Sequence, residues 1–139
     1  MIIKPLLAAA LALVAPLPAL AGQPALTLHF ASVQVHQGKV LIALYDEAGW
    51  TSGKPMRVSM ADAGRADVAA TIEGLAPGRY GVKVFHDRDG DGKMGMNPFG
   101  MPLEPFGFSR DAMGVGGPPA WADAAFDVTA DAVQTITLR

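Results

Sequence analysis

Cysteine is absent from the 139-residue chain. Its absence excludes disulfides, thiolate metal ligands, a cysteine nucleophile and a lipid anchor on cysteine, so stability has to come from an apolar core. An excess of positive charge is also lacking, because 11 Lys and Arg stand against 13 Asp and Glu. Without that excess the chain cannot neutralise a long run of phosphates, and we do not expect a nucleic-acid partner.

Long apolar runs are scarce, and the clearest one lies in residues 1–21. Lys4 supplies a positive charge, an apolar run covers Leu6 to Val14, and Ala19-Leu20-Ala21 has the small-x-small pattern of a cleavage site. The run is shorter than the roughly 20 residues of a transmembrane helix. We therefore expect a signal peptide cleaved after Ala21, one mature domain at residues 22–139 without a membrane span, and a periplasmic or secreted location.

The composition of the remaining chain favours strands over helices. Sixteen glycines and eleven prolines interrupt helices, whereas short apolar stretches with a period of two are typical of half-buried strands. The prediction is an all-β fold, an antiparallel β-sandwich of about seven strands of the immunoglobulin-like or transthyretin-like type. The expected strands cover residues 26–35 with a bend or bulge near 31–32, then 39–45, 56–60, 67–72, 79–86, 121–128 and 133–138.

One turn carries a structural motif of β-sandwiches. Leu75-Ala76-Pro77-Gly78 precedes Arg79-Tyr80 at the start of an expected strand. This spacing resembles the tyrosine corner, in which the phenol hydrogen-bonds to the backbone of the preceding turn. Tyr80 is therefore predicted to have a structural role.

The long loop from residue 87 to residue 119 is the candidate functional site, because a connection of this length in a small domain is usually functional or disordered. Asp87, Asp89 and Asp91 stand at positions 1, 3 and 5 of a calcium loop of the EF-hand type, with glycine at position 6 and the Lys93 carbonyl at position 7. Alternate residues of such a loop direct their oxygens at one hard cation.

The second half of that calcium pattern is missing. Position 12 is Pro98, where a bidentate glutamate is required, and position 9 is Gly95. Asn97 or Glu104 could supply the missing oxygens if the loop folds back. The expected metal set for calcium is therefore Asp87, Asp89, Asp91, Lys93, Asn97 and Glu104. The alternative is a solvated acidic turn, since Asp and Gly are common in tight connections.

Aromatic residues in the same loop suggest a ligand surface. Phe99, Phe106 and Phe108, together with Trp50 and Trp121, could stack against a sugar or a peptide. Ser109 follows directly and is assigned to the same surface. The partner would then be a protein or a glycan, and the surface would need no metal. These rings could equally hold the long loop against the sandwich.

Two further chemistries are less well supported. Met94, Met96, Met101 and Met113 carry the soft thioethers that suit copper, with His86 near them in sequence; methionine is also an adaptable core residue. Ser109, His86 and an aspartate could be drawn as a hydrolase triad, but no nucleophile elbow surrounds Ser109. His29 and His36 have no ligand spacing and are expected at the surface.

The motifs of the long loop also carry a family resemblance. His86-Asp-x-Asp-x-Asp-Gly-Lys93, the proline- and phenylalanine-rich stretch from Asn97 to Ser109, and Gly117 to Phe126 resemble the bacterial exported family called domain of unknown function 2141. The likeness covers essentially the whole mature chain. It implies a signal peptide and a small β-sandwich, with no established activity.

Together these features predict an exported, non-enzymatic sandwich module. A divalent cation, expected to be calcium, would order the loop from Asp87 to Ser109 and so present a binding surface. The rival is a loop ordered by its own aromatic and proline packing. Calcium should stabilise the fold by mass action, whereas a packed loop should ignore a chelator.

Overall fold

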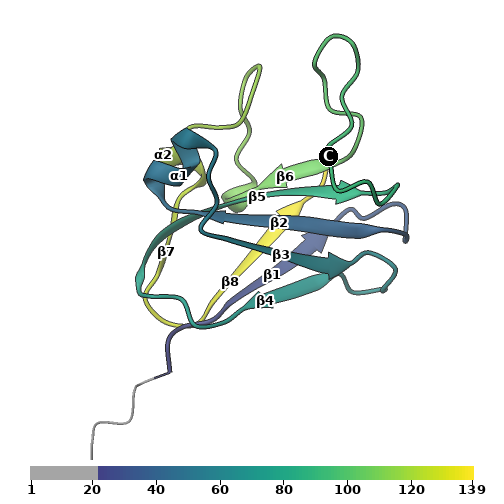
Figure 1. The fold of residues 1–139 in the computed structure, drawn as a ribbon. Helices are drawn as coiled ribbons and strands as arrows, with labels where there is room; N and C mark the ends of the chain where they lie inside the picture. Colours follow the sequence, from purple (N-terminus) through teal and green to yellow (C-terminus); the bar gives the residue numbers. More distant parts are fainter. Residues whose placement is uncertain (1–21) are drawn as a thin grey trace, which may run out of the picture.

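The computed structural model describes residues 22–139, which form two β-sheets with their inner faces together (Figure 1). The first sheet has the strand order β4 (Ala69–Ile72), β1 (Leu26–Ala31), β8 (Ala132–Thr137). The second has the order β3 (Arg57–Asp62), β2 (Lys39–Tyr45), β5 (Gly78–Asp87), β6 (Phe106–Phe108), and β7 (Phe126–Val128) also pairs with β5. The all-β prediction is confirmed, and the architecture is compatible with a β-sandwich.

The core lies between the sheets because every second residue along the long strands is apolar and faces inward. Leu26, Leu28 and Phe30 of β1 face inward, and so do Val40, Ile42 and Leu44 of β2. Both triplets belong to one buried cluster that also includes Val82, Val84 and Ile136. Because neighbouring residues of a strand point to opposite faces, the residues between them lie on the outer face of each sheet.

One strand pair departs from the antiparallel prediction. β8 runs parallel to β1, with Leu26 opposite Ala132 and Ala31 opposite Thr137. The chain reaches β8 from β7, which belongs to the other sheet, and so it enters beside β1 from the same end. A crossover connection of this kind permits parallel pairing, which a tight hairpin does not.

Three predicted segments also differ in the structure. Residues 33–35 do not continue β1, because Ser32 takes a left-handed conformation (φ 62°) and ends the strand. The expected strand at 121–128 divides into the short helix α2 (Trp121–Ala124) and β7. Residues 46–55, which separate two expected strands, contain helix α1 (Glu47–Ser52), which Asp46 caps by accepting a hydrogen bond from the Gly49 N–H at 2.7 Å.

The long loop is more structured than its composition indicated. It contains β6, which adds to the edge of β5, and the 3-10 helix η1 (Ser109–Asp111). A strand of only three residues, Phe-Gly-Phe, is too short to show a periodic pattern. The remaining chain forms two excursions, at residues 94–103 and 112–119, that project to the same side of the molecule (Figure 1).

The tyrosine corner is confirmed. The Tyr80 phenol donates a hydrogen bond to the backbone oxygen of Ala76, and its ring is buried in the core. We expect Tyr80→Phe to lower the free energy of unfolding by about 0.5–1.5 kcal/mol, because it removes this hydrogen bond and keeps the ring. Urea unfolding measures the loss, with Tyr45→Phe as the matched control. Equal effects of the two substitutions would contradict the structural role of the Tyr80 hydroxyl.

Candidate functional site

The acidic loop, residues 87–93, begins at the end of β5, beside the turn at residues 37–38 that precedes β2. His86 is fully buried, and its Nε2 lies 2.7 Å from the backbone oxygen of Gln37 in that turn. Gly38 follows with φ +73°, and a Cβ atom at this position would overlap the backbone oxygen of Asp87. The turn and the start of the loop are therefore in direct contact, and this contact determines where Asp87 lies.

The three aspartates are held by their own loop. The Asp87 carboxylate is buried and accepts the N–H groups of Gly90 and Gly92, each at 2.9 Å. Asp89 accepts the N–H of Asp91 at 3.2 Å, and Asp91 accepts the N–H of Lys93 at 2.9 Å. Each carboxylate thus closes a local turn, which is the behaviour expected of aspartate in tight connections.

Glu104 follows the 94–103 excursion and lies beside the three aspartates. One carboxylate oxygen from each of Asp87, Asp89, Asp91 and Glu104 lies within 4.8 Å of the others. Glu104 is 9% exposed; its Oε1 accepts the Arg88 N–H at 3.3 Å, whereas its Oε2 is buried and has no hydrogen-bond partner in residues 22–139. A buried carboxylate oxygen without a partner is costly, so we expect this oxygen to contact a water molecule or a cation.

The pKa values of Asp87 and Asp89 shift in opposite directions. Burial raises the pKa of Asp87, but hydrogen bonds from Gly92, Asp89, Gly90 and Asp91 outweigh it and hold that pKa below its usual value. For Asp89, the Asp91 N–H lowers the pKa, but the Asp87 carboxyl, burial and the Asp91 charge together raise it above its usual value. The neighbouring carboxyl groups thus act on one another, and a cation placed among them would favour their charged forms.

Asn97 and Lys93 both make hydrogen bonds within the loop. The Asn97 side-chain oxygen accepts the N–H groups of Phe99 and Met101, both at 2.9 Å, and so closes the tip of the first excursion. Lys93 donates its N–H to Asp91. The structure thus brings four of the six predicted residues together through their carboxylates and uses Asn97 within the tip.

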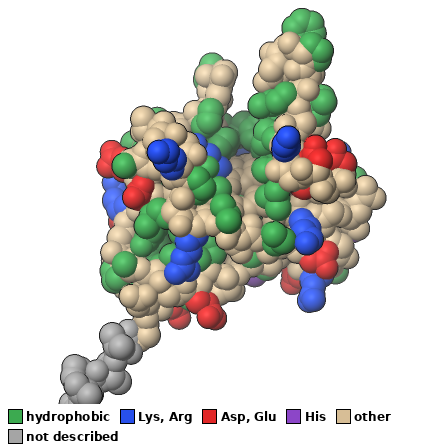
Figure 2. Space-filling model, viewed as in Figure 1, with side chains coloured by type: hydrophobic (Ala, Val, Ile, Leu, Met, Phe, Trp, Pro, Cys, Tyr) green, Lys and Arg blue, Asp and Glu red, His purple; other side chains and the backbone are tan. Residues whose placement is uncertain are grey.

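The first excursion is a β-like hairpin. Met96 bridges to Pro102, and backbone hydrogen bonds join Asn97 to Met101 and Leu103 to Gly95. The acidic loop lies at its base, and Figure 2 shows acidic side chains gathered at the foot of the taller projection. We call residues 94–103 the loop hairpin.

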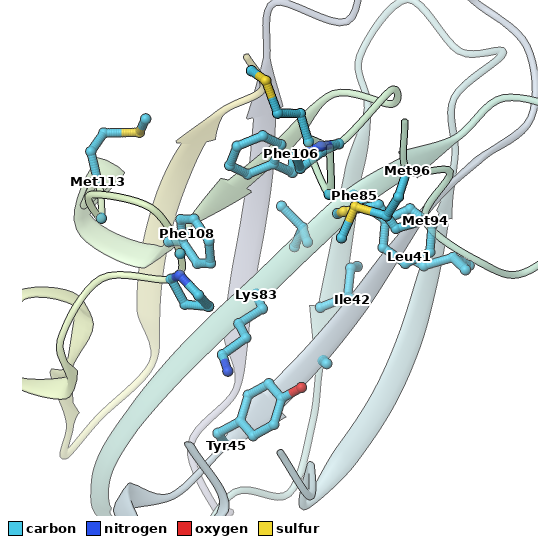
Figure 3. A pocket seen from close by; sticks show the side chains of 18 of the residues that line it. Leu41, Ile42, Tyr45, Lys83, Phe85, Met94, Met96, Phe106, Phe108 and Met113 are labelled. Atoms are coloured by element: carbon cyan, nitrogen blue, oxygen red, sulfur yellow. The ribbon is translucent and has the colours of Figure 1, made fainter. Parts of the chain in front are cut away.

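An apolar cleft of about 1130 Å³ lies between the loop hairpin and the 112–119 excursion (Figures 2 and 3). Its floor is the outer face of the second sheet, where the register aligns two cross-strand rows. The first row is Val58, Ala43, Lys83 and Phe108, and the second is Met60, Leu41, Phe85 and Phe106.

An aromatic cluster closes one end of the cleft. Trp50 contacts Tyr45, Phe108 and Trp121 edge to face, with ring centroids 5.7, 6.3 and 5.8 Å apart. Its Nε1 donates to the backbone oxygen of Pro119 at 3.1 Å. Trp50 therefore joins helix α1 to the end of the 112–119 excursion.

The residues predicted as a ligand surface divide into two groups. Phe99 is 90% exposed, and it lines the cleft together with Phe106 and Phe108. Ser109 is instead fully buried: its hydroxyl donates to the Ala124 oxygen at 2.6 Å and accepts the Val82 N–H at 3.0 Å. This hydroxyl supports the backbone from inside and does not reach the ligand surface.

His86, like Ser109, is buried and hydrogen-bonded inside the protein. Its ring is buried against Gln37 and is not among the residues that line the cleft. His86 therefore does not lie with the methionines that were considered as copper ligands, although five methionines do line the cleft. They are Met60, Met94, Met96, Met101 and Met113. His29 and His36 are exposed, as expected.

Lys83 is the charged residue that lines the cleft, and its sequence pattern did not reveal it. Its ammonium lies 4.6 Å from the Tyr45 ring centroid and 4.4 Å from that of Trp50 (Figure 3). The one available signal is a charged side chain between Val82 and Val84 in the middle of an expected strand.

The fold and the site define a small all-β protein with an acidic loop and an apolar cleft on the outer face of one sheet. The family model described as "uncharacterized protein conserved in bacteria (DUF2141)" matches residues 29–137, so the chain belongs to this family and the resemblance is confirmed. Neither the curated proteins nor the solved structures provide a match. None of the described helices is long and apolar enough to cross a membrane. The predicted signal peptide lies outside the described residues.

Proposed function

We propose that the chain is an exported, non-enzymatic binding module whose cleft is ordered by a calcium ion. Asp87, Asp89, Asp91 and Glu104 would hold the ion. The observation that carries the proposal is the buried Glu104 oxygen, which lies in a cluster of four carboxylates and has no hydrogen-bond partner in the described residues.

Charge supports a cation at this place. The only ion pair within residues 22–139 joins Arg79 to Asp127 at 3.3 Å, so none of the four carboxylates forms a direct ion pair with a described lysine or arginine. Like charges this close repel each other unless a cation lies among them. An all-oxygen ligand set favours a hard cation, and calcium accepts six to eight oxygens in irregular geometry.

The position of the cluster explains how an ion would act on the cleft. Asp87, Asp89 and Asp91 precede the loop hairpin, and Glu104 follows it. An ion between them would fasten both ends of the hairpin together. Because the hairpin forms one wall of the cleft, calcium would reduce its freedom and order the binding surface.

Thermal unfolding of the mature domain, residues 22–139, in calcium and in chelator tests the proposal. Because the glutamate of position 12 is missing, we expect a dissociation constant of roughly 10⁻⁴–10⁻³ M, as in extracellular modules. Calcium at about 100 times that constant adds about 2.7 kcal/mol of stability, which raises the midpoint by several degrees. Asp87→Asn and Glu104→Gln should abolish this rise.

Asp123→Asn is the matched control, because it makes the same chemical change on the exposed helix α2. It should keep the full calcium response. An identical midpoint of the unsubstituted domain in calcium and in chelator would contradict the proposal and favour a loop ordered by its own hydrogen bonds and aromatic packing. Export is tested separately, by fractionating cells and sequencing the N-terminus of the mature protein, which we expect to begin at Gly22.

A further inference from the structure

We infer that the cleft binds an amphipathic carboxylate, a molecule with an apolar chain and a single negative charge that pairs with Lys83. The inference names the ligand class of the binding surface and rests on the proposed function, because the loop hairpin forms one wall of the cleft. This ligand class differs from the protein or glycan partner that the sequence predicted.

The lining of the cleft is almost entirely apolar. Among the described residues that line it, only Lys83 is charged, and Tyr45 and Ser59 carry the only side-chain hydroxyl groups. A sugar needs several hydrogen-bonding groups in its site, because its own hydroxyls lose water on binding. An alkyl chain needs none and gains free energy from each methylene that leaves water.

Exposed apolar side chains are concentrated at this cleft. The structure describes ten large hydrophobic residues that are exposed, and six of them line the cleft. They are Val58, Met60, Met96, Phe99, Met101 and Met113. Contiguous exposed apolar surface marks interaction sites, and flexible methionines adapt to chains of different shape.

Lys83 supplies the charge complementarity. Its ammonium lies among the rings of Tyr45 and Trp50 and donates one hydrogen bond, to the Trp50 backbone oxygen at 3.4 Å. No carboxylate of residues 22–139 pairs with it. Partial burial removes some of the water around the Lys83 ammonium and lowers its pKa below the usual value. An incoming carboxylate would replace the missing solvent with a charge-assisted hydrogen bond.

The geometry fits a ligand with one charged end. Lys83 lies in the cross-strand row beside Phe108, and the second row, which contains Phe85 and Phe106, is apolar throughout. A chain that starts at the amine can therefore cross the second row toward the loop hairpin. Figure 3 shows Met94 and Met96 on that side of the cleft and Met113 on the other.

The experiment titrates the calcium-loaded mature domain with dodecanoate and, in parallel, with uncharged dodecanol. Both are kept at concentrations below their solubility limits in the calcium buffer, so that neither the calcium salt of dodecanoate nor free dodecanol separates. Tryptophan fluorescence reports binding, because Trp50 contacts Lys83. We expect saturable binding of dodecanoate, weakened about tenfold or more by Lys83→Met. Dodecanol should bind the domain and this variant equally. Lys83→Arg should retain most of the preference for the carboxylate.

Two further variants keep the test decisive. Lys54→Met removes an exposed lysine outside the cleft and should leave both affinities unchanged. Met96→Gln changes an exposed wall residue that cannot disturb the core, and should weaken dodecanoate and dodecanol alike.

The inference is overturned if dodecanoate does not bind, or if Lys83→Met leaves its affinity unchanged. It is also overturned if sedimentation shows a dimer that covers the cleft, or if cuprous ion saturates the methionines and dodecanoate does not compete. A failure here is distinguishable from failure of the calcium proposal, because calcium would still raise the unfolding midpoint. Conversely, dodecanoate binding that is equal in calcium and in chelator would support the ligand class and contradict the ordering role of calcium.

Discussion

Trp50→Ala is expected to lower the free energy of unfolding by about 3–5 kcal/mol, the range for losing a buried large aromatic side chain. Trp50 is 7% exposed and makes edge-to-face contacts with Tyr45, Phe108 and Trp121. The substitution also leaves the Pro119 carbonyl without its indole donor in a buried position. The cavity and the lost hydrogen bond act in the same direction.

Urea unfolding followed by circular dichroism measures this loss. Trp121→Ala is the matched control, because Trp121 belongs to the same cluster but is only half-buried, and its removal should cost clearly less. We also expect proteolysis within residues 112–119 to accelerate in the Trp50 variant alone, since Trp50 holds the end of that excursion. Equal losses in the two variants would show that Trp50 does not organise this end of the cleft.

Gly38→Ala is expected to cost more than about 2 kcal/mol and to weaken calcium binding. Its φ of +73° lies in the left-handed region, where a side chain costs about 1–2 kcal/mol. The added Cβ would also overlap the backbone oxygen of Asp87, and overpacking of this kind costs about 1–3 kcal/mol more. Relief of the overlap requires Asp87 to move, and Asp87 holds the first position of the acidic loop.

Gly53→Ala separates the two causes. Gly53 has nearly the same φ, +75°, but its Cβ would meet no atom within 4 Å. It should therefore show only the backbone cost and a normal calcium response. Denaturant unfolding and calcium titration of both variants provide the comparison. If Gly38→Ala behaves like Gly53→Ala in both measurements, the contact between the turn and Asp87 has no energetic importance.

Local sequence patterns were sufficient to predict several strands, the tyrosine corner and the acidic loop, but not the cleft. Alternating apolar residues identified β1 and β5, because strand faces differ between neighbouring residues, and a short run that is apolar on both faces identified β2. The Leu75–Tyr80 spacing identified the tyrosine corner, and the Asp-x-Asp-x-Asp spacing identified the acidic loop. All three features depend on residues that are close together in the chain.

The elements that the sequence did not reveal are short or determined by distant partners. β6 has three residues and forms because β5 offers a free edge, and the parallel pairing of β8 with β1 follows from the crossover between the sheets. Neither feature leaves a periodic signal in its own segment. Propensity alone also favoured a strand at residues 121–128, where the backbone forms α2 before β7.

The sequence by itself determined that the chain is all-β, that its acidic loop presents three aspartates to one point, and that Glu104 is a candidate fourth ligand. The tertiary structure decided that Glu104 reaches the cluster, that Asn97 closes the hairpin tip, and that Ser109 is buried. It also created the cleft, because strand register places Lys83 and Phe108 side by side on the outer face, although 24 residues separate them along the chain. Composition and spacing describe what a segment can do, whereas long-range pairing decides which segments meet.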